Sequence, residues 1–115
     1  MDKYSIAVES ELFKEILVGN AEYVIQLNDY KSNQFKVGNI IKLVDKSEGS
    51  EIDAKIENFF YFKNFKDLFS MINKEKFGYG KTANIDIIED NYVKNFTDEK
   101  IEKYGIVAIK FIREK

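Results

Sequence analysis

The sequence contains no cysteine, histidine, proline or tryptophan. Without cysteine, the chain can form neither a disulfide nor a catalytic thiolate. Without histidine as well, it lacks the ligands of the usual zinc sites, the Ser-His-Asp triad and the Cys-His nucleophile. Any catalysis would therefore depend on lysine, carboxylate, tyrosine, serine or threonine side chains. We expect neither a cofactor nor a bound metal ion.

Arginine is nearly absent, because Arg113 is the single one in the sequence. Lys and Arg together number 18 against 20 Asp and Glu, which gives a formal net charge of −2. Dedicated nucleic-acid-binding domains usually carry a basic patch, and bidentate recognition of phosphate depends on arginine. The composition therefore argues against a strongly basic nucleic-acid-binding surface.

Long apolar runs are also missing. No stretch approaches the roughly 20 residues that cross a membrane, and the start MDKYSIAVES has no signal-peptide core. We therefore expect a soluble, cytoplasmic protein with no membrane partner. Its richness in Lys, Asn and Ile is typical of a bacterial or phage gene of low G+C content.

The sequence does contain enough apolar material for a core. Its 115 residues predict a single domain over residues 1–115. A chain of this size buries roughly 65% of the surface that its unfolded form exposes. Because 44% of the residues are hydrophobic and 15% aromatic, a core can form without disulfides or metals.

Hydrophobic periodicity divides the chain into strands and helices. Ser10 is the expected N-cap of the first helix and Gly19 its expected stop. Gly38 and Asn39 predict a tight turn, and Asn64 is expected to cap a later helix. Strands are predicted at residues 4–8, 22–28, 40–45, 51–62 and 106–112, and helices at 10–20, 64–72, 85–96 and 97–105.

The order of these elements is strand, helix, strand, hairpin, helices, strand. The hairpin joins residues 40–45 to residues 51–62 through the turn KSEGS. Several short strands with helices between them favour an α+β fold over a parallel sheet. We predict a small mixed β-barrel with inserted helices.

The segment GNAEYVIQLND shows how one predicted strand divides its side chains between two sides. Alternate residues are apolar, and this set predicts the face toward the core. The intervening set predicts the opposite side, which would line any cleft. The core set is Tyr23, Ile25 and Leu27, and the cleft set is Glu22, Val24 and Gln26.

Five short pieces then follow one another along nearly the whole chain. They are the helix ending at Gly19, IQLND, FKVGNIIKL, FKNFKDLFSMI followed by FGYG, and the ending EKYGIVAIKF. In this order and spacing the chain resembles the ASCH domain family, the homology domain of an activating signal cointegrator, which has a PUA-like fold. The resemblance implies a β-barrel with a cleft and links to RNA and modified nucleosides. Some small bacterial members resemble amidohydrolases that deacetylate acetylcytidine.

The family's hallmark is Gly-x-Lys-x-x-Glu-x-Arg, with threonine at the glutamate position in hydrolase-like members. Gly19 matches, whereas Ala21, Val24 and Gln26 stand at the lysine, glutamate and arginine positions. A lysine of depressed pKa can activate a hydroxyl, which alanine cannot do. Valine offers no hydrogen bond, and glutamine can bind a base edge but cannot neutralise a phosphate. The resemblance thus implies a degenerate active site with no catalytic residues.

Five residues are candidates for ligand binding. Glu22 and Gln26 share the predicted cleft face, although exposed polar strand residues are commonly only solvated. Asn28 ends the strand and is equally suited to a turn. Tyr79, in FGYGK beside Lys81, can stack on a base, although an ordinary packed tyrosine explains it as well.

Residues 63–81 interleave lysines with aromatic residues, as nucleic-acid-binding surfaces do. Most of these aromatics fit the buried stripe of a helix, so a core role explains them better. Tyr92 and Phe96 lie four residues apart in a predicted helix and are also interpreted as core. Any RNA binding should therefore be weak and sensitive to salt.

Three functions remain open. The first is a binding module for single-stranded RNA or a nucleoside- or nucleotide-like ligand, without catalysis. The second is a divergent amidohydrolase acting on acetylated cytidine, in which Lys36, Lys42 or Glu75 replaces the lost groups. The third is a protein-binding regulator from a phage or mobile element, which fits the 7 basic and 11 acidic side chains of residues 1–57. We favour the first, because the pieces of the scaffold are kept while its charged groups are lost.

Overall fold

The computed structural model describes residues 4–29, 32–93 and 96–114. Each predicted strand lies within one residue of its expected bounds. The helix predicted over residues 85–96 is described up to Val93, and residues 94–95 lie outside the described part. In chain order the elements are β1 (Tyr4–Val8), α1 (Ser10–Leu17), β2 (Tyr23–Leu27), η1 (Ser32–Gln34), β3 (Ile40–Asp45), β4 (Glu51–Phe62), α2 (Phe65–Met71), η2 (Lys74–Phe77), α3 (Ile85–Val93), α4 (Asp98–Tyr104) and β5 (Ile106–Arg113).

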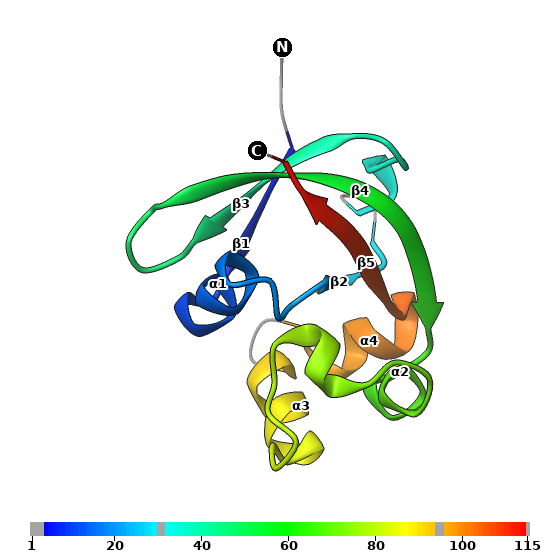
Figure 1. The fold of residues 1–115 in the computed structure, drawn as a ribbon. Coiled ribbons are helices and arrows are strands. Elements are labelled where there is room, and N and C mark those ends of the chain that lie inside the picture. The colour runs from blue at the N-terminus through cyan, green and yellow to red at the C-terminus, as the bar shows by residue number, and fades with distance from the viewer. Residues whose placement is uncertain (1–3, 30–31, 94–95, 115) are drawn as a thin grey trace.

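The five strands form one sheet in the order β1-β3-β4-β5-β2. The β1–β3 pair is parallel and the other three pairs are antiparallel. The sheet curls into a half-barrel, and α2, α3 and α4 gather on one side of it (Figure 1). The predicted mixed α+β architecture is therefore present as an open, barrel-like sheet whose two edge strands are β1 and β2.

The long strand β4 makes the curl possible. Its first half pairs with β3 and its second half with β5, and the register shifts between Ile56 and Asn58. One extra residue in one strand bends it and increases its local twist. The predicted hairpin is also confirmed, since Val44 of β3 pairs with Glu51 of β4 across the turn.

Local capping follows the sequence in α2 and departs from it in α1. Asn64 Oδ1 accepts a hydrogen bond from Asp67 N at 2.8 Å, as a helix N-cap does. In α1, however, the N-cap is Glu9, whose side chain makes no capping bond. The expectation that Ser10 caps α1 is therefore wrong. Its hydroxyl instead donates to Asp45 Oδ1, at the end of β3.

The sheet separates two apolar clusters, which we name the barrel cluster and the helix cluster. In β5, Val107 and Ile109 belong to the barrel cluster, whereas Ile106 and Ala108 belong to the helix cluster. Strand β2 is divided in the same way, and Val24 is 1% exposed on the barrel side. The prediction of a single core face on β2 is therefore incomplete, because helices cover one side while the barrel interior fills the other.

Gly105 shows why the chain needs glycine where α4 turns into β5. Its φ is +76°, a backbone conformation that L side chains rarely adopt. A Cβ atom there would lie 2.9 Å from the carbonyl oxygen of Phe62. The predicted stop of the last helix at this glycine is thus confirmed, and close packing against β4 adds to the requirement.

Among the described residues, no helix combines the length and the apolarity needed to cross a bilayer.

Candidate functional site

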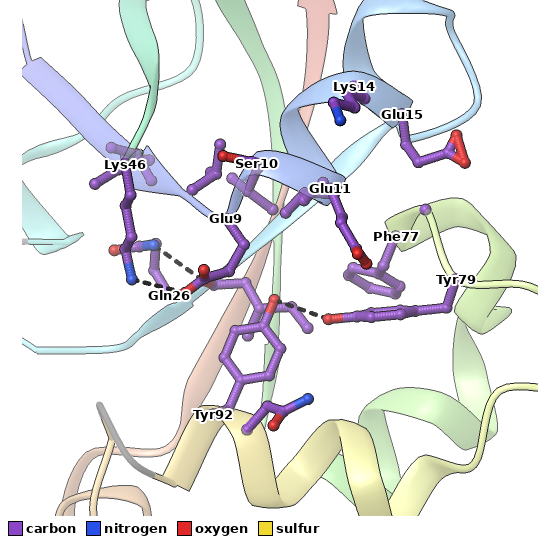
Figure 2. A pocket seen from close by; sticks show the side chains of 18 of the residues that line it. Glu9, Ser10, Glu11, Lys14, Glu15, Gln26, Lys46, Phe77, Tyr79 and Tyr92 are labelled. Carbon is purple, nitrogen blue, oxygen red and sulfur yellow. Dashed lines mark hydrogen bonds and ion pairs between the residues drawn. The ribbon is translucent and has the colours of Figure 1, made fainter. Parts of the chain in front are cut away.

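A cleft of about 1020 Å³ lies at the open seam between β1 and β2. Its walls come from the end of β1, the start of α1, the middle of β2, the turn after β3, the loop after η2 and α3. Figure 2 shows Glu9, Gln26, Phe77, Tyr79 and Tyr92 around this space. The residues that carry the chemistry of the site are Glu9, Ser10, Glu11, Lys14, Glu15, Gln26, Lys46, Phe77, Tyr79 and Tyr92.

The seam exposes the main chain of β2 to the cleft. Phe111 N donates to Glu22 O at 3.1 Å, which fixes the residues of β2 that hydrogen-bond to β5. Because an antiparallel ladder alternates, the N–H and C=O groups of Ile25 point away from β5 and toward the open edge. Gln26 Nε2 donates to Ile25 O at 3.0 Å and so satisfies one of these edge groups.

The main chain of β1 forms the facing edge. Val8 O accepts a hydrogen bond from Lys46 N at 3.0 Å, so the main chain of Val8 faces β3. The groups of Ala7 then point to the other side, toward the cleft that Ala7 lines. A ligand here meets main-chain donors and acceptors from two strands that do not pair with each other.

The floor of the cleft is apolar and one wall is aromatic. Val24 and Phe77 are each 1% exposed and close the bottom. Gly78 has φ +89°, and a Cβ atom there would lie 3.1 Å from the side chain of Leu12. This close approach to α1 turns the chain so that Tyr79 stands over the cleft (Figure 2).

Tyr79 and Tyr92 form a hydroxyl pair inside the cleft. Tyr79 Oη donates to Tyr92 Oη at 3.5 Å, as the dashed line in Figure 2 marks. Burial raises the pKa of Tyr79 and raises the pKa of Tyr92 well above its ordinary value of 10.0. Both phenols therefore stay protonated near neutral pH. They can stack and hydrogen-bond, but neither is ionised to act as a base or nucleophile.

Gln26 offers the cleft an amide. Its Nε2 donates to Ile25 O, and its Oε1 is the acceptor end of the amide. An amide oxygen can accept a hydrogen bond from a base edge or an amine. The side chain is half-buried at the Lys46 end of the cleft (Figure 2).

The described lining of the cleft carries more negative than positive charge. Three glutamates line it against two lysines, and Lys46 Nζ lies 3.1 Å from Glu9 Oε1, which offsets one charge of each sign. Glu11 extends from α1 toward Phe77 and Tyr79 (Figure 2). The described lining therefore carries a surplus of one negative charge, which favours a neutral or cationic group over a phosphate.

Ser10 is the hydroxyl beside the cleft that most resembles a nucleophile. Its Oγ donates to Asp45 Oδ1 at 2.5 Å, and Asp45 is 5% exposed. The hydrogen bond from Ser10 lowers the pKa of Asp45, and the main-chain N–H groups of Ser47 and Glu48 lower it further. A carboxylate of lowered pKa is a weak base near neutral pH. The pair therefore anchors α1 to the turn after β3 and does not activate the hydroxyl.

This anchor predicts a pH dependence of stability. The pKa of Asp45 lies below 3.8 in the folded chain, so its stabilising effect is present above that value and is lost as the pH falls through the lower folded pKa. Asp45→Asn is expected to lower the Tm at neutral pH, and the difference from wild type should shrink below about pH 3.8. Thermal unfolding followed by circular dichroism across this range measures it. Asp90→Asn, at an exposed position in α3, is the matched control. A constant difference at every pH would contradict the assignment.

The five sequence-predicted site residues separate into two groups. Gln26 and Tyr79 both line the cleft. Glu22 instead pairs with Lys76, at 2.8 Å between Oε2 and Nζ. Asn28 lies beyond the cleft lining, at the end of β2, and its buried Oδ1 has no hydrogen-bond partner among the described residues. Lys81 is exposed beside a smaller hollow that it shares with Tyr79.

The positions of the family hallmark lie in different surroundings. Val24 and Gln26 line the cleft, but Ala21 is 4% exposed within the barrel cluster and is not part of the cleft lining. Lys42, one proposed substitute for the lost groups, is engaged with Asp53 at 3.0 Å. Neither it nor the other two candidates, Lys36 and Glu75, belongs to the cleft lining.

Sequence reasoning missed Glu9, Glu11 and Tyr92 as site residues. Tyr92 packs against Phe65, with ring centroids 5.3 Å apart, so its interpretation as core is correct for one side of its ring. Its hydroxyl end reaches the cleft, and helical spacing alone cannot reveal that. Within the described residues, no cluster of three or more Asp or Glu side chains forms a metal site.

Among the solved structures that share this fold are two proteins. The crystal structure of hypothetical protein PH0355 superposes with a TM-score of 0.84 and 24% sequence identity, covering 98% of this chain and 100% of that chain. The solution NMR structure of protein PF0455 from Pyrococcus furiosus superposes with a TM-score of 0.74 and 21% identity, covering 99% of both chains. At these identities the likeness establishes the fold alone. No family model matches the sequence, and no curated protein matches it.

Proposed function

We propose that this protein is a binding module that holds a nucleoside-like ligand in the cleft between β1 and β2, without catalysis. The observation that carries the proposal is the lining of the cleft. An apolar floor, two protonated tyrosines and the Gln26 amide stand together in a space of about 1020 Å³. Aromatic faces stack on bases of any sequence, and an amide reads a base edge.

The size of the cleft suits a nucleoside better than a folded nucleic acid. Small-molecule pockets typically measure about 300–1,000 Å³ and combine apolar walls with a few polar groups. The acidic lining opposes a sugar-phosphate backbone, so single-stranded RNA would contribute one unpaired base rather than a bound strand. A nucleoside or a single exposed base is therefore the preferred ligand.

The ASCH-like, PUA-like assignment belongs to the same proposal. An open barrel-like sheet with helices gathered on one side is compatible with it. The amidohydrolase alternative is disfavoured, because Ser10 donates to a carboxylate of lowered pKa and the two tyrosines stay protonated. The described cleft lining offers lysines only at Lys14 and Lys46, and Lys46 is paired with Glu9.

Binding and its dependence on Tyr79 test the proposal. Cytidine, acetylcytidine, uridine, guanosine and a short single-stranded RNA are titrated at low salt, and amide chemical shifts are followed by NMR. Shift changes are expected around Gln26 and Tyr79. Because base–aromatic stacking contributes about 1–3 kcal/mol, Tyr79→Ala is expected to weaken binding by about 5- to 150-fold.

Tyr61→Ala is the matched control. Tyr61 is 60% exposed on β4 and lies outside the cleft, so its loss should leave the affinity unchanged. The proposal fails if no nucleoside or RNA in the panel shifts the resonances of the cleft. Equal weakening by both tyrosine variants would contradict a role for Tyr79 in the site.

A further inference from the structure

We infer that the ligand of this cleft carries its positive charge on an aromatic ring, as a cationic nucleobase does. The inference rests on the proposed function, because it names the chemical class of the nucleoside that the same cleft holds. It follows from two properties of the cleft that combine: its aromatic rings and its surplus of carboxylates.

Aromatic rings supply the first property. Phe77, Tyr79, Tyr92 and Phe96 all line the cleft, and the rings of Tyr92 and Phe96 lie 5.6 Å apart. The face of an aromatic ring is electron-rich, so it attracts a cation within about 6 Å of its centre. A neutral base stacks on such a ring as well, but it does not gain the electrostatic part of the interaction.

Glu11 supplies the second property. Its side chain extends from the first turn of α1 toward Phe77 and Tyr79 (Figure 2), and Glu11 lines the same cleft as the two tyrosines. Glu9 is engaged by Lys46, and Glu15 accepts a hydrogen bond from Asn20 at 3.1 Å. Glu11 therefore remains the carboxylate best placed to face a ligand over the aromatic wall.

The electrostatics of the tyrosines point the same way. Burial is the main reason that the pKa of Tyr79 and of Tyr92 is raised, and the charge of Glu9 raises both further. The negative field of Glu9 therefore reaches the hydroxyl pair in the middle of the cleft. The same field favours a cation and opposes a phosphate.

The experiment compares rings that differ in charge. Isothermal titration calorimetry at low salt and mildly acidic pH measures 7-methylguanosine, whose ring is cationic, against guanosine, whose ring is neutral. Guanosine 5′-monophosphate reports the effect of a phosphate, and benzyltrimethylammonium is a cation without a nucleoside. 7-Methylguanosine is expected to bind about tenfold more tightly than guanosine, and the monophosphate more weakly than guanosine.

Glu11→Gln separates the charge effect from stacking. It keeps the length of the side chain and should remove most of the preference for the methylated ring, while the affinity for guanosine changes little. Glu102→Gln, an exposed position in α4 outside the cleft, should preserve the preference. A preference for 7-methylguanosine that survives Glu11→Gln unchanged would contradict the role given to Glu11.

The outcomes distinguish this inference from the proposed function. If guanosine binds as tightly as 7-methylguanosine, nucleoside binding stands and the cationic ligand is wrong. If benzyltrimethylammonium binds in the cleft and no nucleoside does, the cleft selects cations and the nucleoside proposal is wrong. If none of these four probes binds, and none of the nucleosides or RNA titrated by NMR does either, both are wrong.

Discussion

Replacing Ala21 by lysine is expected to lower the free energy of unfolding by at least about 3 kcal/mol at neutral pH. Ala21 is 4% exposed and packs among the apolar side chains of the barrel cluster. A lysine amine there loses its hydration without a partner in that cluster, and burial pushes its pKa below the usual value. A lysine at this position, as in the hallmark of the ASCH family that the sequence resembles, therefore cannot be introduced without damage to the core.

The pH dependence identifies the cause of this loss. In the folded chain the buried lysine is either neutral or charged at a cost in free energy. In the unfolded chain it is charged below about pH 10.4. The destabilisation is therefore full at neutral pH and shrinks as the pH rises toward the unfolded pKa. Urea unfolding at neutral and alkaline pH measures it. Ala7→Lys, at an exposed position of β1, is the matched control and should change stability little. An equally small effect at both sites would show that position 21 tolerates charge.

The burial of position 21 also affects the deacetylase activity expected of variants. The variant carrying Ala21→Lys, Val24→Thr and Gln26→Arg is expected to show no deacetylase activity, because the hallmark groups act as a unit and the first substitution disturbs the fold that must hold them. Incubation with acetylcytidine and detection of released cytidine tests this variant beside the wild type. Clear turnover by the wild-type protein would overturn the view that its cleft only binds.

Phe65→Ala is expected to lower the free energy of unfolding by about 3–5 kcal/mol. Phe65 is 0% exposed at the start of α2, and its ring lies 6.3 Å from that of Phe69 and 5.3 Å from that of Tyr92. Deleting the ring removes transfer free energy and leaves a cavity that its neighbours fill only in part. Because small domains have about 5–15 kcal/mol of stability in total, much of the protein's stability would be lost.

Two measurements on Phe65→Ala distinguish a local loss of packing at the cleft from a loss of global stability. Urea unfolding gives the stability, while NMR titration at low temperature reports ligand binding by the fraction that stays folded. Tyr92 loses the support of one ring face in Phe65→Ala, so affinity should fall as well. Phe65→Leu fills most of the space and should cost less than the alanine variant on both measures. A loss below about 1 kcal/mol for Phe65→Ala would show that the helix cluster is loosely packed.

Much of the local structure could be predicted because its causes are local. The alternation of apolar and polar residues predicts β1, β3 and β4 at their observed bounds. Asn64 caps α2 as its sequence pattern indicates. The prediction for Ser10 was wrong because a distant carboxylate, Asp45, competes for the same hydroxyl. Nothing in the sequence around Ser10 indicates that the end of β3 lies beside it.

The lining of the candidate site could be predicted only where its causes are local. Gln26 and Tyr79 were found from strand alternation and from a loop motif, and both line the cleft. Tyr92 was interpreted as core, because a helical repeat gives its side but not the hollow that its hydroxyl reaches. Glu11 had no signal at all, since a glutamate in the first turn of a helix is ordinary.

The sequence by itself determined the available chemistry. With neither histidine nor cysteine, the side chains allow stacking, hydrogen bonding and charge recognition but exclude the common nucleophile and zinc chemistries. Only the tertiary structure decided which of these side chains come together. The parallel pairing of β1 with β3 leaves β1 and β2 as unpaired edges, and the helices after β4 bring Tyr79 and Tyr92 to the seam between them. Such contacts join residues far apart in the chain, so hydrophobic periodicity, which depends on near neighbours, cannot predict them.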